Sequence, residues 1–267
     1  MRKGILTLVF ALILLSVSVL PAGAITWGEP DVDHSNVGAM VVDWPDYGPW
    51  QWCSGTLIHP RVFLTAGHCT DRLEEDYGIE QVWVNFDPYA VNEASLLDVE
   101  TVITHPEYTW GSNNPHDVGL LILAEPVTDI QPATLPQAGY LDDLKKEGLL
   151  RQENEGAMFA VVGYGGTLDW PPPDITYEDV RQVAFSEYVA LVPYQLHLNQ
   201  HIFKDNGGTC FGDSGGPVFY NSEADGTEVI VGITSWGDAQ CVVTGFYYRV
   251  DIADTLDFIA AVISQLE

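Results

Sequence analysis

The chain has 267 residues, of which 46% are hydrophobic and 11% aromatic, enough apolar material for a large buried core. This aromatic content excludes an intrinsically disordered chain, and scattered glycines without a heptad pattern exclude collagen-like and coiled-coil proteins. With 10 basic residues against 38 acidic ones, the formal net charge is −28. A chain this acidic repels phosphate groups, so we expect no nucleic-acid binding and no docking on an anionic membrane.

The first 24 residues have the pattern of a secretory signal peptide. Two basic residues precede an apolar run from Ile5 to Leu20, and Ala22-x-Ala24 is a small-residue cleavage pattern. A membrane anchor is the alternative, but this run is short for a helix that spans a bilayer. We therefore expect residues 1–24 to be cleaved, and the mature chain to begin at Ile25, to be secreted and to be free of the membrane.

The mature chain has mostly short runs that are apolar or alternate in polarity, separated by Gly, Pro, Asn and Asp. This pattern is typical of an all-β sandwich or barrel. Residues 137–156 are polar and charged, and we interpret them as a linker between two halves. Strands are predicted at Ala39–Val42, Ser54–Ile58, Val62–Thr65, Gln81–Asn85, Val99–Ile103, Gly119–Leu123, Phe159–Gly163, Val180–Tyr188, Val218–Tyr220, Val229–Trp236 and Gly245–Val250.

The end of the chain differs from the rest, because its apolar residues recur every three or four positions. This spacing predicts one amphipathic helix over 251–266, with Asp251 as its N-cap. The apolar residues are Ile252, Leu256, Ile259, Ile263 and Leu266.

The four cysteines are Cys53, Cys69, Cys210 and Cys241. In an exported chain an even number predicts two disulfides, and counting alone leaves three pairings open. A zinc site is the alternative, but the sequence has no C-x-x-C pair and no Cys/His spacing that supports one.

Three short motifs carry side chains suited to nucleophilic acyl transfer. His68 lies in Thr-Ala-Gly-His-Cys, Asp117 precedes an apolar run in His-Asp-Val-Gly-Leu-Leu, and Ser214 lies in Gly-Asp-Ser-Gly-Gly-Pro. A serine hydroxyl needs a base, a histidine can take and return its proton, and a buried carboxylate fixes the histidine tautomer. Glycines beside the serine let backbone N–H groups approach a developing oxyanion.

In this order the three motifs resemble the chymotrypsin/trypsin-like serine endopeptidases, and the resemblance extends from residue 25 to the terminal helix. It implies that His68 is the general base and acid, that Asp117 orients it, and that Ser214 is the nucleophile. It also implies an oxyanion hole formed by the N–H groups of Gly212 and Ser214.

The resemblance further implies the fold and the disulfides. We expect an all-β fold of two antiparallel six-stranded β-barrels, one at about 25–136 and one at about 157–250, with the site between them and the helix last. The implied disulfides are Cys53–Cys69 and Cys210–Cys241. Other disulfides of the animal members have no cysteines here, so the chain looks like a pared-down, bacterial-type member.

In the family that this chain resembles, activation exposes a new N-terminus, which inserts into the fold. Its ammonium group then pairs with the aspartate that precedes the catalytic serine. Here Ile25 would be exposed by signal cleavage, and its partner would be Asp213. A buried carboxylate left unpaired is costly, so this pair could order the oxyanion loop.

The specificity pocket implied by the motif alignment has Gly208 at its base, Thr209 beside it, and Gly237 and Gly245 on its walls. Trypsin-like members that bind Arg or Lys have an aspartate at the base, which this chain lacks. We expect a neutral, open pocket that favours a large apolar or aromatic side chain.

A secreted endopeptidase acting on polypeptides, as a monomer and without a cofactor, is therefore the expected function. A catalytically inactive protease-fold binding protein and an esterase remain alternatives, although inactive members usually lack a triad residue and α/β-hydrolases place the serine first. No metal is expected. The acidic cluster at 71–80 is interpreted as a solvated face, with a calcium site as the alternative.

Overall fold

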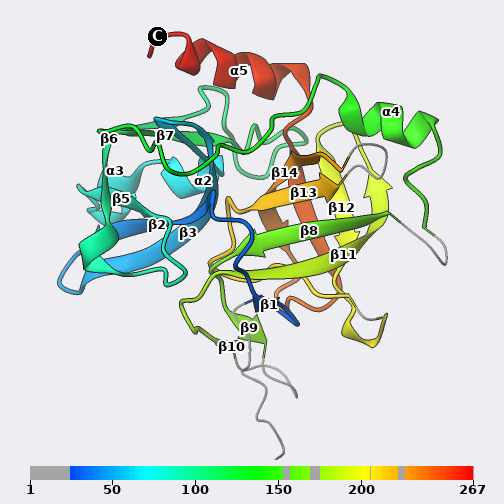
Figure 1. The fold of residues 1–267 in the computed structure, drawn as a ribbon, viewed down its shortest axis with the longest axis horizontal. Coiled ribbons are helices and arrows are strands. Elements are labelled where there is room, and N and C mark those ends of the chain that lie inside the picture. Colours follow the sequence, from blue (N-terminus) through cyan, green and yellow to red (C-terminus); the bar gives the residue numbers. More distant parts are fainter. Residues whose placement is uncertain (1–24, 153–156, 169–174, 205, 222–225, 267) are drawn as a thin grey trace, which may run out of the picture.

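A computed structural model describes residues 25–152, 157–168, 175–204, 206–221 and 226–266. Two β-barrels lie side by side, and a C-terminal helix follows the second one (Figure 1). This is the all-β fold of two barrels that the resemblance implied. The predicted signal peptide lies outside the described residues. No helix in the described ranges is both long and apolar enough to cross a bilayer.

The first barrel is a closed antiparallel ring in the order β2-β3-β4-β7-β6-β5. Two short helices, α2 (Gly67–Thr70) and α3 (Leu73–Tyr77), follow β4, and the 3-10 turn η1 (Glu93–Ser95) precedes β6. The strands are β2 (Val37–Trp44), β3 (Gly48–His59), β4 (Val62–Thr65), β5 (Val82–Asn85), β6 (Leu97–Thr104) and β7 (Gly119–Leu123).

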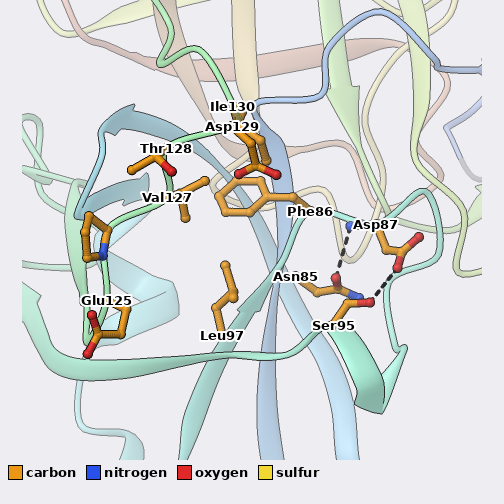
Figure 2. A pocket seen from close by; sticks show the side chains of 11 residues that line it. Asn85, Phe86, Asp87, Ser95, Leu97, Glu125, Val127, Thr128, Asp129 and Ile130 are labelled. Carbon is orange, nitrogen blue, oxygen red and sulfur yellow. Dashed lines mark hydrogen bonds between the residues drawn. The ribbon is translucent and has the colours of Figure 1, made fainter.

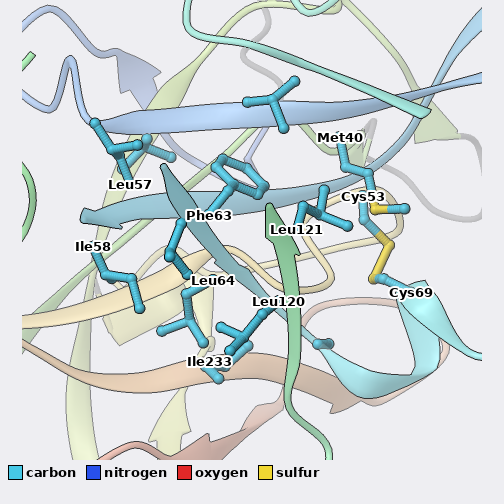
Figure 3. Close-up of a cluster of buried hydrophobic side chains, with 14 of the residues drawn as sticks. Met40, Cys53, Leu57, Ile58, Phe63, Leu64, Cys69, Leu120, Leu121 and Ile233 are labelled. Carbon is cyan, nitrogen blue, oxygen red and sulfur yellow. A yellow bond between two sulfur atoms is a disulfide. The ribbon is translucent and has the colours of Figure 1, made fainter. Parts of the chain in front are cut away.

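The core of the first barrel forms where β4 and β7 pair, because every residue of these two strands is buried. Phe63 pairs with Leu121 in register, and both side chains are fully buried. Figure 3 shows Ile233, from the second barrel, against the same cluster. One hydrophobic cluster therefore extends from the first barrel into the second and fixes their inner edges, while a separate cluster that includes Phe159 and Leu198 fills the rest of the second barrel.

The second barrel closes because β8 pairs with both β13 and β11. Its ring order is β11-β12-β15-β14-β13-β8, and β1 (Glu29–Pro30) adds to the outside of β11. The strands are β8 (Met158–Gly163), β11 (Gln182–Leu191), β12 (Gln195–Asn199), β13 (Pro217–Asn221), β14 (Glu228–Gly237) and β15 (Thr244–Arg249).

The remaining elements lie outside the two rings. A small hairpin pairs β9 (Thr167–Leu168) with β10 (Ile175–Thr176), and the 3-10 turn η2 (Ile202–Lys204) follows β12. Helix α4 (Tyr140–Lys146) lies within the stretch interpreted as a linker, and α5 (Ala253–Ile263) ends the fold.

Each predicted strand overlaps an observed one, whereas β12 and the short β1, β9 and β10 were not predicted. β1 lies in the range expected for the first barrel, yet it pairs with the second. The predicted face of α5 packs on the core through Ile259. The N-cap prediction was wrong: Ile252 holds that position, and Asp251 instead pairs with the buried guanidinium of Arg249 at 2.8 Å.

Candidate active site

His68 and Asp117 are brought together at the ends of two paired strands. β4 leads into α2, which carries His68, and β7 begins directly after the loop that carries Asp117. The Nδ1 atom of His68 lies 3.0 Å from Oδ2 and 3.1 Å from Oδ1 of Asp117. The backbone N–H of His68 also donates to Oδ1 at 2.9 Å. These contacts fix both the position of the ring and the orientation of its Nδ1 edge.

Asp117 is fully buried, and a second donor reaches it from the other barrel. The hydroxyl of Ser235, on β14, donates to Oδ2 at 2.5 Å. Burial by itself raises the pKa of Asp117, but attraction to His68 and the hydrogen bonds from His68 and Ser235 outweigh it and lower the pKa. The carboxylate therefore stays ionised beside the imidazole.

The loop that carries Ser214 is held against the first barrel by β3. The N–H of Ser54 donates to the carbonyl of Ser214 at 2.8 Å. The Gly212 carbonyl accepts from the side chains of Gln51 at 2.8 Å and Ser54 at 3.0 Å. A Cβ on Gly215 would overlap Thr65 and lie 2.8 Å from the amide nitrogen of Ala66, two residues before His68. The serine loop and the histidine thus approach each other across the line between the barrels.

Among the described residues, no hydrogen bond joins the Ser214 hydroxyl to the His68 ring. The N–H groups of Gly212 and Ser214 likewise have no protein acceptor within the described part of the chain. Gly212 has φ +97° and Gly215 has φ +81°, a backbone region that disfavours any side chain. The turn therefore leaves two backbone donors for another acceptor.

Asp213 lies beneath this turn and is fully buried. Its two oxygens accept from the N–H groups of Gly165 at 2.7 Å and Cys210 at 2.8 Å. Burial is the main cause that raises the pKa of Asp213 to about 7, and these two bonds only partly oppose it. Within the described residues, no cationic side chain pairs with this carboxylate.

Ile25 is also fully buried, but its nitrogen does not contact Asp213. In this continuous chain the nitrogen is a peptide amide, and it donates to Oε1 of Gln182 at 3.0 Å. Its carbonyl accepts from Thr167 at 3.3 Å, and Thr167 lies two residues beyond a residue bonded to Asp213. The expected ion pair is therefore absent from the uncleaved chain, although the two residues contact the same loop.

The four residues expected to form the specificity pocket are gathered by the second barrel. Gly237 and Gly245 are register partners in β14 and β15, and Gly208 pairs with the N-terminal segment at Thr26. Thr209 is buried, and its hydroxyl lies 3.1 Å from that of Tyr247. No carboxylate lies among these residues.

Both disulfides implied by the resemblance are formed. Cys53–Cys69 joins β3 to α2 directly after His68, and Cys210–Cys241 joins the serine loop to the β14–β15 turn. Each therefore ties a candidate catalytic segment to its own barrel.

Among the described residues, one cluster outside this site has metal-ligating side chains: His105, His116 and Asp254. The two imidazole rings stack at 4.8 Å with an interplanar angle of 18°, so their lone pairs are almost parallel and do not converge on one ion. Asp254 instead accepts from His116 at 2.8 Å, which links the loop before β7 to α5. In the described ranges the acidic residues of 71–80 form no comparable cluster, and Asp76 pairs with Arg72.

A separate pocket opens on the first barrel, away from the candidate catalytic residues (Figure 2). Its lining includes the apolar side chains of Phe86, Leu97 and Ile130 and carboxylates such as that of Asp87. Ser95 donates to Asp87 at 2.7 Å, so this carboxylate already has a partner. None of the candidate site residues lines this pocket.

The double barrel, with His68, Asp117 and Ser214 on facing edges, defines the chymotrypsin-like class. The sequence model of the family named Trypsin matches residues 25–259. The chain belongs to this family of serine endopeptidases. Similar proteins include mouse (Mus musculus) vitamin K-dependent protein C, 31% identical over 70% of this chain and 40% of that protein. Rat (Rattus norvegicus) protein C is 28% identical over 79% of this chain and 49% of that protein. Mouse tryptase is 29% identical over 74% of this chain and 74% of that protein. The chain thus spans less than half the length of these protein C relatives.

Sequence reasoning missed several residues that shape the site. Ser235 stands in a Ser-Trp-Gly stretch that resembles a substrate-binding segment, so a signal was present for it. Gln51 and Ser54 have no local motif, because their roles arise from contacts with Gly212, more than 150 residues away in the chain. Gln200 contacts Thr209, nine residues away, and likewise has no motif.

Proposed function

We propose that this chain is a secreted serine endopeptidase that hydrolyses peptide bonds through an acyl-enzyme intermediate. The observation that carries the proposal is the fixed contact between His68 and the buried Asp117 beside a serine turn with two unpaired N–H groups. His68 takes the proton of the Ser214 hydroxyl as its oxygen attacks the carbonyl carbon, and returns that proton to the leaving amine. Water then attacks the acyl group by the same route, which releases the acid and frees the serine.

Asp117 stabilises the imidazolium that forms during each step, because it is ionised and contacts Nδ1. The N–H groups of Gly212 and Ser214 stabilise the oxyanion, since they are rigidly held and have no competing protein acceptor in the described chain. Removing one such donor typically lowers kcat by about 10²–10³-fold.

Activation follows cleavage before Ile25 under this proposal. The new ammonium would exchange Gln182 for Asp213, whose buried carboxylate otherwise lacks a cation. This pairing would hold the turn between Cys210 and Ser214 in its competent form. Secretion rests on the signal-like residues 1–24, and N-terminal sequencing of the exported protein tests it.

The neutral pocket formed by Gly208, Thr209, Gly237 and Gly245 favours a large apolar or aromatic side chain on the substrate. A polypeptide substrate is the partner that this chemistry requires, and no resident cofactor takes part in it.

Labelling with a fluorophosphonate tests the function. The mature protein should label at Ser214 and cleave a peptide library, and Ser214→Ala should do neither while keeping the same urea unfolding midpoint. A folded wild-type protein that neither labels nor cleaves would instead support the alternative of an inactive protease-fold binding protein.

A further inference from the structure

Gln200, a residue that no motif indicates, packs its side chain against Gly208, the residue expected at the base of the specificity pocket. This residue follows β12, whose neighbour β15 carries Gly245. A Cβ on Gly208 would overlap the Gln200 side chain, and one on Gly237 would lie 3.6 Å from Gln200 Oε1. The amide therefore lies between the expected base of the pocket and one of its walls.

The two ends of this amide differ in how they are satisfied. Nε2 of Gln200 donates to the carbonyl of Thr209 at 2.7 Å, which fixes the orientation of the amide because a carbonyl can only accept. Oε1 is buried and has no hydrogen-bond partner among the described residues. Gln200 itself is fully buried. A buried acceptor without a donor is costly, so a ligand that supplies one gains affinity.

The surroundings restrict which donor fits. A cationic tip would need a carboxylate, and the nearby one, Asp213, is committed to the N–H groups of two other residues. An amide tip would bring its own carbonyl, yet the Gln200 N–H is used and the Thr209 hydroxyl is paired with Tyr247. A phenol supplies one O–H donor on a large flat ring and adds only a weak acceptor.

We propose that Gln200 is a specificity-determining residue, and that its Oε1 accepts a hydrogen bond from the hydroxyl of a tyrosine side chain on the acyl side of the scissile bond. This inference rests on the proposed endopeptidase function and narrows its aromatic preference to tyrosine over phenylalanine. A substrate with a hydrocarbon side chain of similar size, such as phenylalanine, leaves Gln200 Oε1 without a donor and is cleaved more slowly.

The test uses the mature protein and two fluorogenic peptides that differ only in Tyr or Phe before the cleaved bond. We expect kcat/KM for the tyrosine peptide to be about tenfold higher, the usual worth of one net hydrogen bond. In Gln200→Met, which keeps the length of the side chain and removes the acceptor, the ratio should fall to about one. Gln195→Met, at the other end of β12 and outside the pocket, is the matched control and should keep the wild-type ratio.

The outcomes separate this inference from the function on which it rests. Wild-type cleavage of both peptides at equal rates, or a ratio that Gln200→Met leaves unchanged, overturns the role of Gln200 while the endopeptidase function stands. The wild-type comparison requires no variant, so it decides even if Gln200→Met fails to fold. Absence of fluorophosphonate labelling and of all cleavage overturns both.

Discussion

The ionisation of Asp213 should depend strongly on whether Ile25 carries a free ammonium. In a chain with a methionine added before Ile25, the nitrogen of Ile25 is an amide, as it is in the structure, where it donates to Gln182. The buried Asp213 then has two backbone donors and no cation among the described residues. In a chain that begins at Ile25, the ammonium should pair with this carboxylate.

The size and sign of the effect follow from the pKa. Burial raises the pKa of Asp213 from 3.8 to about 7, so the folded chain keeps a proton that the unfolded chain loses between these values. The contribution of Asp213 to stability is therefore fully present below about pH 4 and is lost as pH rises through about 7. At 1.36 kcal/mol for each pKa unit, the loss is about 4 kcal/mol. Pairing with the ammonium should remove most of this loss in the chain that begins at Ile25.

Urea unfolding between pH 4 and pH 8.5 measures the effect, with Ser214→Ala in every chain to prevent self-digestion. Asp213→Asn in the extended chain is the control: it costs one backbone hydrogen bond at all pH values and should remove the pH-dependent loss. If the unfolding free energy of the extended chain changed with pH in the same way with Asp213 and with Asn at position 213, the raised pKa of Asp213 would be refuted. Coincident curves for the extended chain and the chain that begins at Ile25 would refute the ion pair.

The remaining predictions concern the hydrogen bonds, turns and disulfides of the site. Ser235→Ala removes the 2.5 Å bond to Asp117, so kcat/KM should fall by about tenfold and the acid limb of its pH profile should move upward; an unchanged profile would contradict this. Gly215→Ala forces a Cβ into Thr65 at positive φ, whereas Gly139→Ala has positive φ with open space around it. The first should lose roughly 2 kcal/mol more than the second in urea unfolding, and equal losses would argue against the overlap. Reducing both disulfides, which close loops of 16 and 31 residues, should lower unfolding free energy by roughly 6–7 kcal/mol in the chain-entropy treatment; a loss under about 2 kcal/mol would exclude that treatment here.

Local pattern was sufficient for most of the strands and for the final helix. The run Gly119–Leu123 is apolar at every position because both of its faces are buried, and it forms β7 as predicted. The three- and four-residue spacing after residue 251 likewise places Ile259 on the core. Such signals are readable from the sequence because burial repeats with the period of the element itself.

The chemistry-bearing motifs were also visible in the sequence, since each is a contiguous string of residues with its own backbone requirement. The glycines on both sides of Ser214 are an example, with φ of +97° and +81° that a side chain would oppose. A motif does not show which residues from distant parts of the sequence lie beside it in the fold. His68 and Asp117 are 49 residues apart, and their contact depends on β4 pairing with β7.

Tertiary structure alone decided the partners of the buried polar groups. Asp251 has the sequence context of an N-cap, but in the fold its carboxylate accepts hydrogen bonds from the N–H of Leu141, 110 residues away in the sequence, and from the Arg249 guanidinium. Gln200 lies beside Gly208 and Gly237, which depends on the pairing of β12 with β15, and no residue near Gln200 in the sequence reveals this pairing. A buried polar atom needs a hydrogen-bond partner, and the fold determines which groups lie close enough to be that partner, whatever their separation in the sequence.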